Sequence, residues 1–106
     1  MRAFELSVSE SYDANKMSGI EGHFVYLLLD GSDVVYVGKT NNAKSRVKFH
    51  RISGKAFDSI QFIECSKLDQ RPLERVLIYG LNPKYNTQVT WPSQDDYSVS
   101  EKYLKQ

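Results

Sequence analysis

The sequence is short of three things: it has a single cysteine, Cys65, only three prolines, and no long apolar run. One cysteine excludes an internal disulfide and a cysteine-based zinc cluster. No run approaches the roughly 18 apolar residues that a membrane-spanning helix requires. The first residues, Met1 to Glu5, also lack the charged-then-apolar pattern of a secretion signal. We therefore expect a cytoplasmic protein that has no membrane role.

Net charge is also nearly absent, since 14 Lys and Arg are balanced by 13 Asp and Glu. A net charge of +1 argues against a protein that coats nucleic acid through general electrostatics. The distribution is uneven, however, because every charged residue from position 39 to position 55 is basic. These residues are Lys39, Lys44, Arg46, Lys48, Arg51 and Lys55. A local basic strip on a nearly neutral body predicts a short contact with nucleic-acid phosphates.

With 106 residues the chain has the length of about one domain. Residues 1–21 mix polar residues without periodicity, which predicts an irregular N-terminal arm. His23–Leu29 and Val34–Val37 are apolar and β-branched runs on either side of the turn sequence Asp30-Gly31, which predicts an antiparallel hairpin. A helix is then predicted from an N-cap at Asn41 or Asn42 to the stop at Ser53-Gly54.

Residues Ser59–Cys65 alternate in polarity and predict a third strand. Pro72 suits the first turn of a helix that runs to a glycine stop at Gly80. The following Asn82-Pro83-Lys84-Tyr85-Asn86 predicts a turn that brings Tyr85 back to the body, and a short last helix is expected from about Ser98. The order is strand, strand, helix, strand, helix. We predict an α+β fold with a small three-stranded antiparallel sheet flanked by helices. The domain is expected over residues 22–88, followed by a C-terminal loop and short helix over residues 89–106.

Six residues stand out as candidate functional groups, although each also has an ordinary structural explanation. Tyrosines in strands usually belong to the core, and a basic residue or histidine on a helix usually lies on its solvated side. An acid near a helix start commonly complements the dipole, and an asparagine often caps a turn. Only the joint order and spacing favour a site. The six are Tyr26, Tyr36, Arg46, His50, Glu74 and Asn86.

Between His23 and Thr87 the sequence resembles the GIY-YIG nuclease family. The resemblance rests on Val25-Tyr26-Leu27, on Tyr36-Val37-Gly38-Lys39-Thr40, on Arg46 with His50 four residues later, on Leu73-Glu74-Arg75, and on Leu81 to Asn86. The stretch from Tyr26 to Val47 is most similar to the N-terminal nuclease domain of the bacterial excision-repair incision protein. The chain departs from the family pattern at Phe24 and Val25, just before Tyr26.

The resemblance implies the fold of that family and a role for each residue. Glu74 would be the single protein ligand of Mg²⁺, or Mn²⁺, and Arg46 would hold the phosphate. Tyr26 would act as general base on the attacking water, supported by Tyr36. A free tyrosine with a pKa near 10 is about one part in a thousand ionised at pH 7, so Lys39 is expected to favour the tyrosinate.

The resemblance leaves the role of His50 open between relaying a proton from Tyr26 and donating a hydrogen bond to a phosphate. Asn86 is expected to be structural and to tie its loop to the site.

The implied function is metal-dependent DNA endonuclease activity that leaves 5′-phosphate and 3′-hydroxyl ends. The small size of the chain and the lack of a targeting domain favour a phage or mobile-element enzyme of loose specificity. Two alternatives remain. The chain could be a nuclease module that acts only in a homo-oligomer or with a specificity partner, as in restriction or repair, since no zinc finger or helix-turn-helix accompanies the catalytic motifs. It could also be an inactive relative that only binds DNA.

Overall fold

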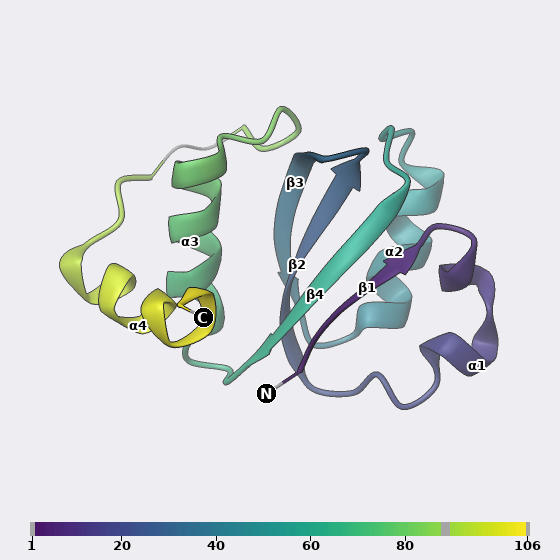
Figure 1. Cartoon of the computed structure of the whole chain (residues 1–106), viewed down its shortest axis with the longest axis horizontal. Coiled ribbons are helices and arrows are strands. Elements are labelled where there is room, and N and C mark those ends of the chain that lie inside the picture. Colours follow the sequence, from purple (N-terminus) through teal and green to yellow (C-terminus); the bar gives the residue numbers. More distant parts are fainter. Residues whose placement is uncertain (1, 88–89, 106) are drawn as a thin grey trace.

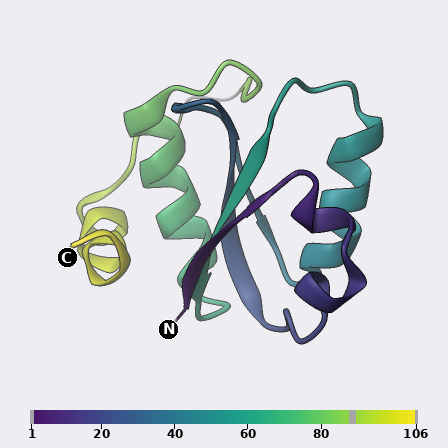
Figure 2. The same cartoon turned by 45° about the vertical axis from the view of Figure 1, so that its right-hand side comes forward.

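A four-stranded antiparallel sheet forms the middle layer of the molecule, with helices on both faces (Figures 1 and 2). The computed structural model describes residues 2–87 and 90–105. Its strands lie in the order β1-β4-β2-β3, so that β1 and β3 form the two edges. The predicted α+β class is therefore confirmed, and the predicted three-stranded sheet is corrected to four strands. The predicted boundary at residues 88 and 89 lies outside the described residues.

The predicted hairpin is confirmed as β2 (His23–Asp30) and β3 (Asp33–Thr40). Gly31 provides the turn, because its φ of 64° is a left-handed conformation that glycine adopts without strain. Strand β2 is central and its residues 24–28 are all buried, which explains why its sequence is almost continuously apolar rather than alternating.

Helix α2 (Ala43–Ile52) covers one face of the sheet and begins where the sequence predicts. The side chain of Asn42 accepts a hydrogen bond from the Ser45 amide, as an N-cap does. Its buried side chains are those of Ala43, Val47 and His50, and the two apolar ones join the core on this face.

The other face carries α3 (Gln70–Leu81), which follows the predicted strand β4 (Ser59–Cys65). Leu73 is fully buried against Val25, Leu27 and other side chains of the second core cluster. The helix passes through the expected stop at Gly80 and ends instead at Asn82, whose φ of 48° is left-handed. Asparagine tolerates this conformation better than most residues and can therefore replace glycine as the terminator.

The predicted irregular arm is wrong, because residues 3–17 contain β1 (Ala3–Ser7), the short 3₁₀ helix η1 (Glu10–Tyr12) and α1 (Ala14–Met17). Strand β1 pairs antiparallel with β4 at the edge of the sheet. The ring of Phe4 stacks on that of Phe62 with centroids 5.1 Å apart. The segment is therefore held in the sheet by a partner that is distant in the sequence.

The last helix, α4 (Gln94–Leu104), begins four residues before the expected Ser98. The signal is a capping box, in which Ser93 and Asp96 each bond the backbone amide of the other. Helix α4 packs on α3, and an ion pair of 3.0 Å joins Arg75 Nη1 to Asp96 Oδ2. Within the described ranges, no helix combines the length and the apolar character that crossing a membrane requires.

Candidate active site

The candidate site lies along the β3 edge of the sheet, where side chains from both faces of the sheet come close to one another. Strand alternation directs Tyr36 and Gly38 towards α2, and Val37 and Lys39 towards α3. Tyr26 on β2 pairs with Gly38 and so faces α2 as well. The site therefore draws on β2, β3, α2, α3 and the loop after α3.

A hydrogen bond of 2.8 Å joins the Tyr26 hydroxyl to His50 Nε2. Both side chains are buried, with 3% and 2% of their surface exposed. The Tyr36 ring lies beside them, its centroid 6.1 Å from that of Tyr26 and 5.0 Å from that of His50. The helix and the hairpin thus bring three predicted site residues into one cluster.

Gly38 makes this cluster possible, although it is not among the predicted site residues. A Cβ atom at position 38 would lie 2.5 Å from the Tyr26 hydroxyl oxygen and 2.9 Å from Cε2 of Tyr36. The two tyrosines therefore occupy space that only glycine leaves free. The signal in the sequence is the glycine directly across the hairpin from Tyr26.

Burial lowers the pKa of His50 to about 4, with further contributions from the nearby charges of Lys55 and Arg46. The imidazole is therefore neutral at pH 7 and can accept a proton. Its Nδ1 is buried and has no hydrogen-bond partner in the part of the chain that the structure describes. Of the two expected roles, a direct hydrogen bond to a phosphate would require the ring, which is 2% exposed, to become accessible. The proton relay with Tyr26 has the required contact.

The pKa of Tyr26 is raised, chiefly by burial and then by Tyr36, while Arg46 opposes the rise. The expectation that Lys39 favours the tyrosinate is wrong, since the residue faces the opposite side of β3. There Lys39 acts on Glu74, where it opposes the rise in the carboxyl pKa that burial causes. The resting site therefore holds a neutral Tyr26.

Glu74 is half-buried on α3 and lines a cavity of about 390 Å³ together with Tyr36 and Asn86. The positive charges of Lys39, Arg71 and Arg75 act on its carboxylate and oppose the rise in its pKa that burial causes. Residues 2–87 and 90–105 contain no cluster of three or more His, Cys, Asp and Glu that would enclose a metal. A partly desolvated carboxylate that lines an open cavity fits a cation that keeps most of its ligands as water, which is the preference of Mg²⁺.

Asn86 has the structural contact expected of it. Its Oδ1 accepts a hydrogen bond from the Val37 amide and its Nδ2 donates one to the Val37 carbonyl, both at 2.9 Å. The Tyr85 amide donates to the Val35 carbonyl in the same loop. The loop thus satisfies part of the open edge of β3 and forms one wall of the cavity at Glu74.

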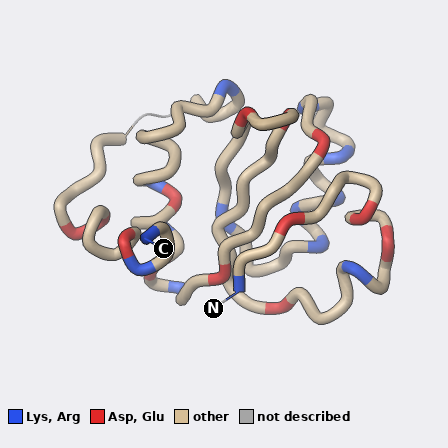
Figure 3. Tube along the Cα trace, in the orientation of Figure 1, with Lys and Arg blue, Asp and Glu red and all other residues tan. Residues whose placement is uncertain are grey.

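The predicted basic strip divides between the two sides of α2. At 3.6 residues per turn, Lys44, Lys48 and Arg51 lie on one side of the buried stripe, and Arg46 lies on the other. Arg51 packs over the Tyr12 ring at 4.0 Å, away from the site. The strip therefore divides between two sides of the helix, and Figure 3 marks the basic positions along the backbone in blue.

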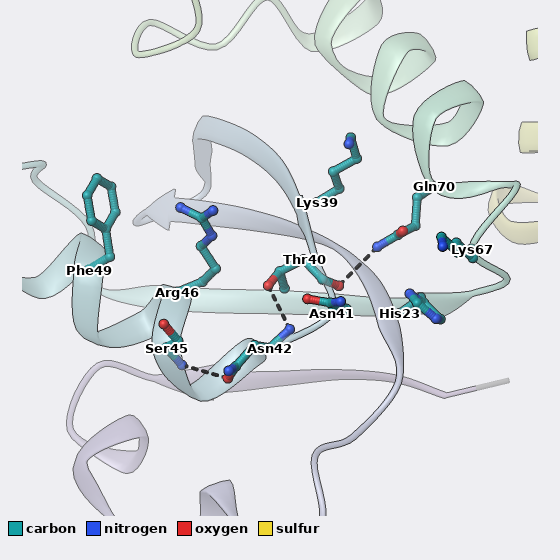
Figure 4. A pocket seen from close by; sticks show the side chains of 10 residues that line it. All are labelled: His23, Lys39, Thr40, Asn41, Asn42, Ser45, Arg46, Phe49, Lys67 and Gln70. Carbon is teal, nitrogen blue, oxygen red and sulfur yellow. Dashed lines mark hydrogen bonds between the residues drawn. The ribbon is translucent and has the colours of Figure 1, made fainter.

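Arg46 and Lys39 line a second cavity, of about 480 Å³, together with Lys67 from the connection between β4 and α3 (Figure 4). The ammonium of Lys55, three residues beyond the end of α2, lies 5.2 Å from the centroid of the Tyr36 ring. Lys67 is not among the predicted binding residues, since no local pattern distinguishes it. Only the fold brings it to Lys39 and Arg46.

Comparisons of the chain with protein-family models, with curated proteins and with solved structures find no match.

Proposed function

We propose that this chain is a metal-dependent DNA endonuclease of the GIY-YIG type, which hydrolyses phosphodiesters to 5′-phosphate and 3′-hydroxyl ends with loose sequence specificity. One observation carries the proposal. The hydroxyl of Tyr26 is bonded to a neutral His50 at a point where the charges of both Arg46 and Glu74 act on it. A base, a proton acceptor, a phosphate-binding cation and an acidic ligand thus meet at one strand edge.

Arg46 is exposed beside the cluster and always charged, so its guanidinium would bind the phosphate and offset the charge that develops on it. A bound phosphate would in turn oppose the positive fields of Arg46 and Lys55 at His50. The pKa of the imidazole would then rise from about 4 and make it a better base. Tyr26 would accept the proton of the attacking water at its hydroxyl oxygen while passing its own proton to Nε2 of His50.

Glu74 would hold the divalent cation in the cavity that Tyr36 and Asn86 share with it. When bound, Mg²⁺ or Mn²⁺ supplies neutralisation of charge at the phosphate. The carboxylate is suited to the task because burial disfavours its charged form, so a cation there would stabilise it. Asn86 keeps the loop in place without touching the reacting atoms.

The test is cleavage of supercoiled plasmid by the purified protein with Mg²⁺, Mn²⁺ or EDTA. Glu74→Gln and Tyr26→Phe are expected to abolish metal-dependent nicking. Glu101→Gln and Tyr97→Phe on α4 are the matched controls and should cut as the wild type does, because both residues are exposed and distant in the fold. Wild-type protein that never cuts, or Glu74→Gln protein that cuts normally, would contradict the proposal.

DNA binding without hydrolysis is the second candidate, and the burial of Tyr26 with its raised pKa favours it. A tyrosine that is 3% exposed also serves as an ordinary core residue. The two candidates differ in the plasmid assay, since a binder would retard the plasmid on a gel and leave it supercoiled with either metal.

A further inference from the structure

The 480 Å³ cavity extends beyond the groups that the proposed hydrolysis requires. Arg46 and Phe49 of α2 lie at one end, while Lys67 and His23 lie at the other (Figure 4). Three lysine and arginine side chains line it, and none of the described lining residues is acidic. Its volume falls within the range of about 300–1,000 Å³ found for small-ligand pockets. The pocket is therefore suited to an anionic group larger than one phosphate.

Phe49 gives the pocket an unusual apolar surface, because 49% of this residue is exposed. Cations lie near its ring, with the Arg46 guanidinium 5.7 Å and the Lys55 ammonium 5.8 Å from the centroid. The same ammonium lies 5.2 Å from the centroid of Tyr36, which places Phe49 next to the candidate active site. An exposed aromatic ring among phosphate-binding cations is the arrangement with which proteins bind unpaired nucleotides.

The opposite end of the pocket has a fixed floor. Gln70 is 9% exposed, and its Nε2 donates to the carbonyls of both Phe24 and Thr40 at 3.1 and 3.0 Å. These bonds tie the start of α3 to β2 and β3. Lys67 precedes this anchored residue and projects beside the pocket. The start of α3, three residues after Lys67, is thus anchored to both strands of the hairpin.

We propose that this pocket binds a nucleotide of an unpaired DNA strand adjacent to the cleaved phosphate. The base stacks on Phe49, Arg46 contacts the cleaved phosphate, and Lys67 contacts a neighbouring phosphate. The assignment rests on the proposed nuclease function, whose substrate class it narrows to single-stranded or frayed DNA. A base within a duplex is already stacked on its neighbours and would have to leave the helix to reach the ring.

The test measures binding rather than cleavage, in EDTA, by fluorescence anisotropy. The probes are a fluorescein-labelled single strand of roughly 12 nucleotides and the blunt duplex of the same sequence. Wild-type protein is expected to bind the single strand more tightly. Phe49→Ala should weaken single-strand binding about tenfold, whereas Phe49→Tyr should retain it. Ile52→Ala is the matched control, since this exposed residue belongs to the same helix and does not line the pocket.

Lys67→Ala is expected to weaken single-strand binding and to make it less sensitive to salt. Lys16→Ala removes an exposed lysine from α1 and should change neither the affinity for the single strand nor its sensitivity to salt. Tighter duplex than single-strand binding, or equal binding by wild type and Phe49→Ala, would overturn the assignment. Neither result would change the expected outcome of the plasmid assay, so the pocket assignment can fail while the proposed nuclease function stands. Phe49-dependent binding by a protein that does not cut would support the pocket and reject the nuclease.

Discussion

Among single residues, Gly38 has a steric role that can be tested separately from chemistry. Gly38→Ala would bring a methyl group within 2.5 Å of the Tyr26 hydroxyl oxygen. Because Tyr26 is buried and bonded to His50, we expect the free energy of unfolding to fall by about 1–3 kcal/mol. Plasmid cleavage should fall with it, since the hydroxyl is displaced. Urea denaturation measures the first effect.

Gly80→Ala is the matched control for this substitution. A Cβ there meets no described atom within 4 Å, and the residue lies inside α3. Alanine is favoured over glycine in a helix by roughly 0.5–1 kcal/mol, so this variant should be slightly more stable than the wild type. If Gly38→Ala behaved like Gly80→Ala, the close packing of Tyr26 on position 38 would be refuted.

The buried imidazole of His50 predicts a loss of stability in acid. Its pKa is about 4 in the folded protein and about 6.5 when exposed, so between these values the unfolded chain binds more protons. Stability is therefore full above pH 6.5 and declines until about pH 4, by about 3 kcal/mol in all. Urea denaturation at several pH values should show a smaller decline for His50→Gln than for the wild type. His23→Gln, which replaces the other histidine, should retain the wild-type decline.

At the level of elements, the loop after α3 acts as a short partner for the edge of β3. Asn86→Ala removes both hydrogen bonds to Val37, and we expect a loss of about 1–3 kcal/mol because backbone groups of the strand lose their partner. Hydrogen exchange at the Val37 amide should become faster. Thr87→Ala, at an exposed neighbouring position, should leave this amide protected. Unchanged protection in Asn86→Ala would show that the loop is held by other contacts.

The elements that the sequence predicts well are those whose signals are local. Alternating polarity marks β4, and the Asn42 cap marks the start of α2. The sequence does not predict strand β1, because Phe4 and Leu6 alternate over only five residues and the strand depends on its pairing with β4. The candidate site is also predicted best from local signals, since the order of the motifs along the chain predicts the clustering of Tyr26, Tyr36 and His50. It does not predict that Lys67 joins Arg46, or that Lys39 faces away from Tyr26.

At the scale of the whole molecule, the described residues form one candidate active site, at one edge of the sheet. Under the proposed function one site would cut one strand at a time, so cleavage of both strands would require two copies or two binding events. We expect dilute protein to accumulate nicked plasmid first, with linear product increasing as protein concentration rises. Sedimentation over the same concentrations would show whether dimers form in parallel. Linear product that appears without a nicked intermediate at every concentration would instead indicate a stable dimer.

The nearly neutral charge of the whole chain predicts weak salt dependence of DNA binding. The proposed binding mode has two phosphate contacts, from Arg46 and Lys67 of the pocket, and at about 0.7 each they give a slope of about −1.4 in log affinity against log salt for a single strand. Lys67→Ala should reduce its magnitude by about 0.7. The double variant with Lys44→Ala and Lys48→Ala should keep the wild-type slope, because these residues lie on the far side of α2. A wild-type slope of about −5 or steeper would show that both sides of the helix contact the strand.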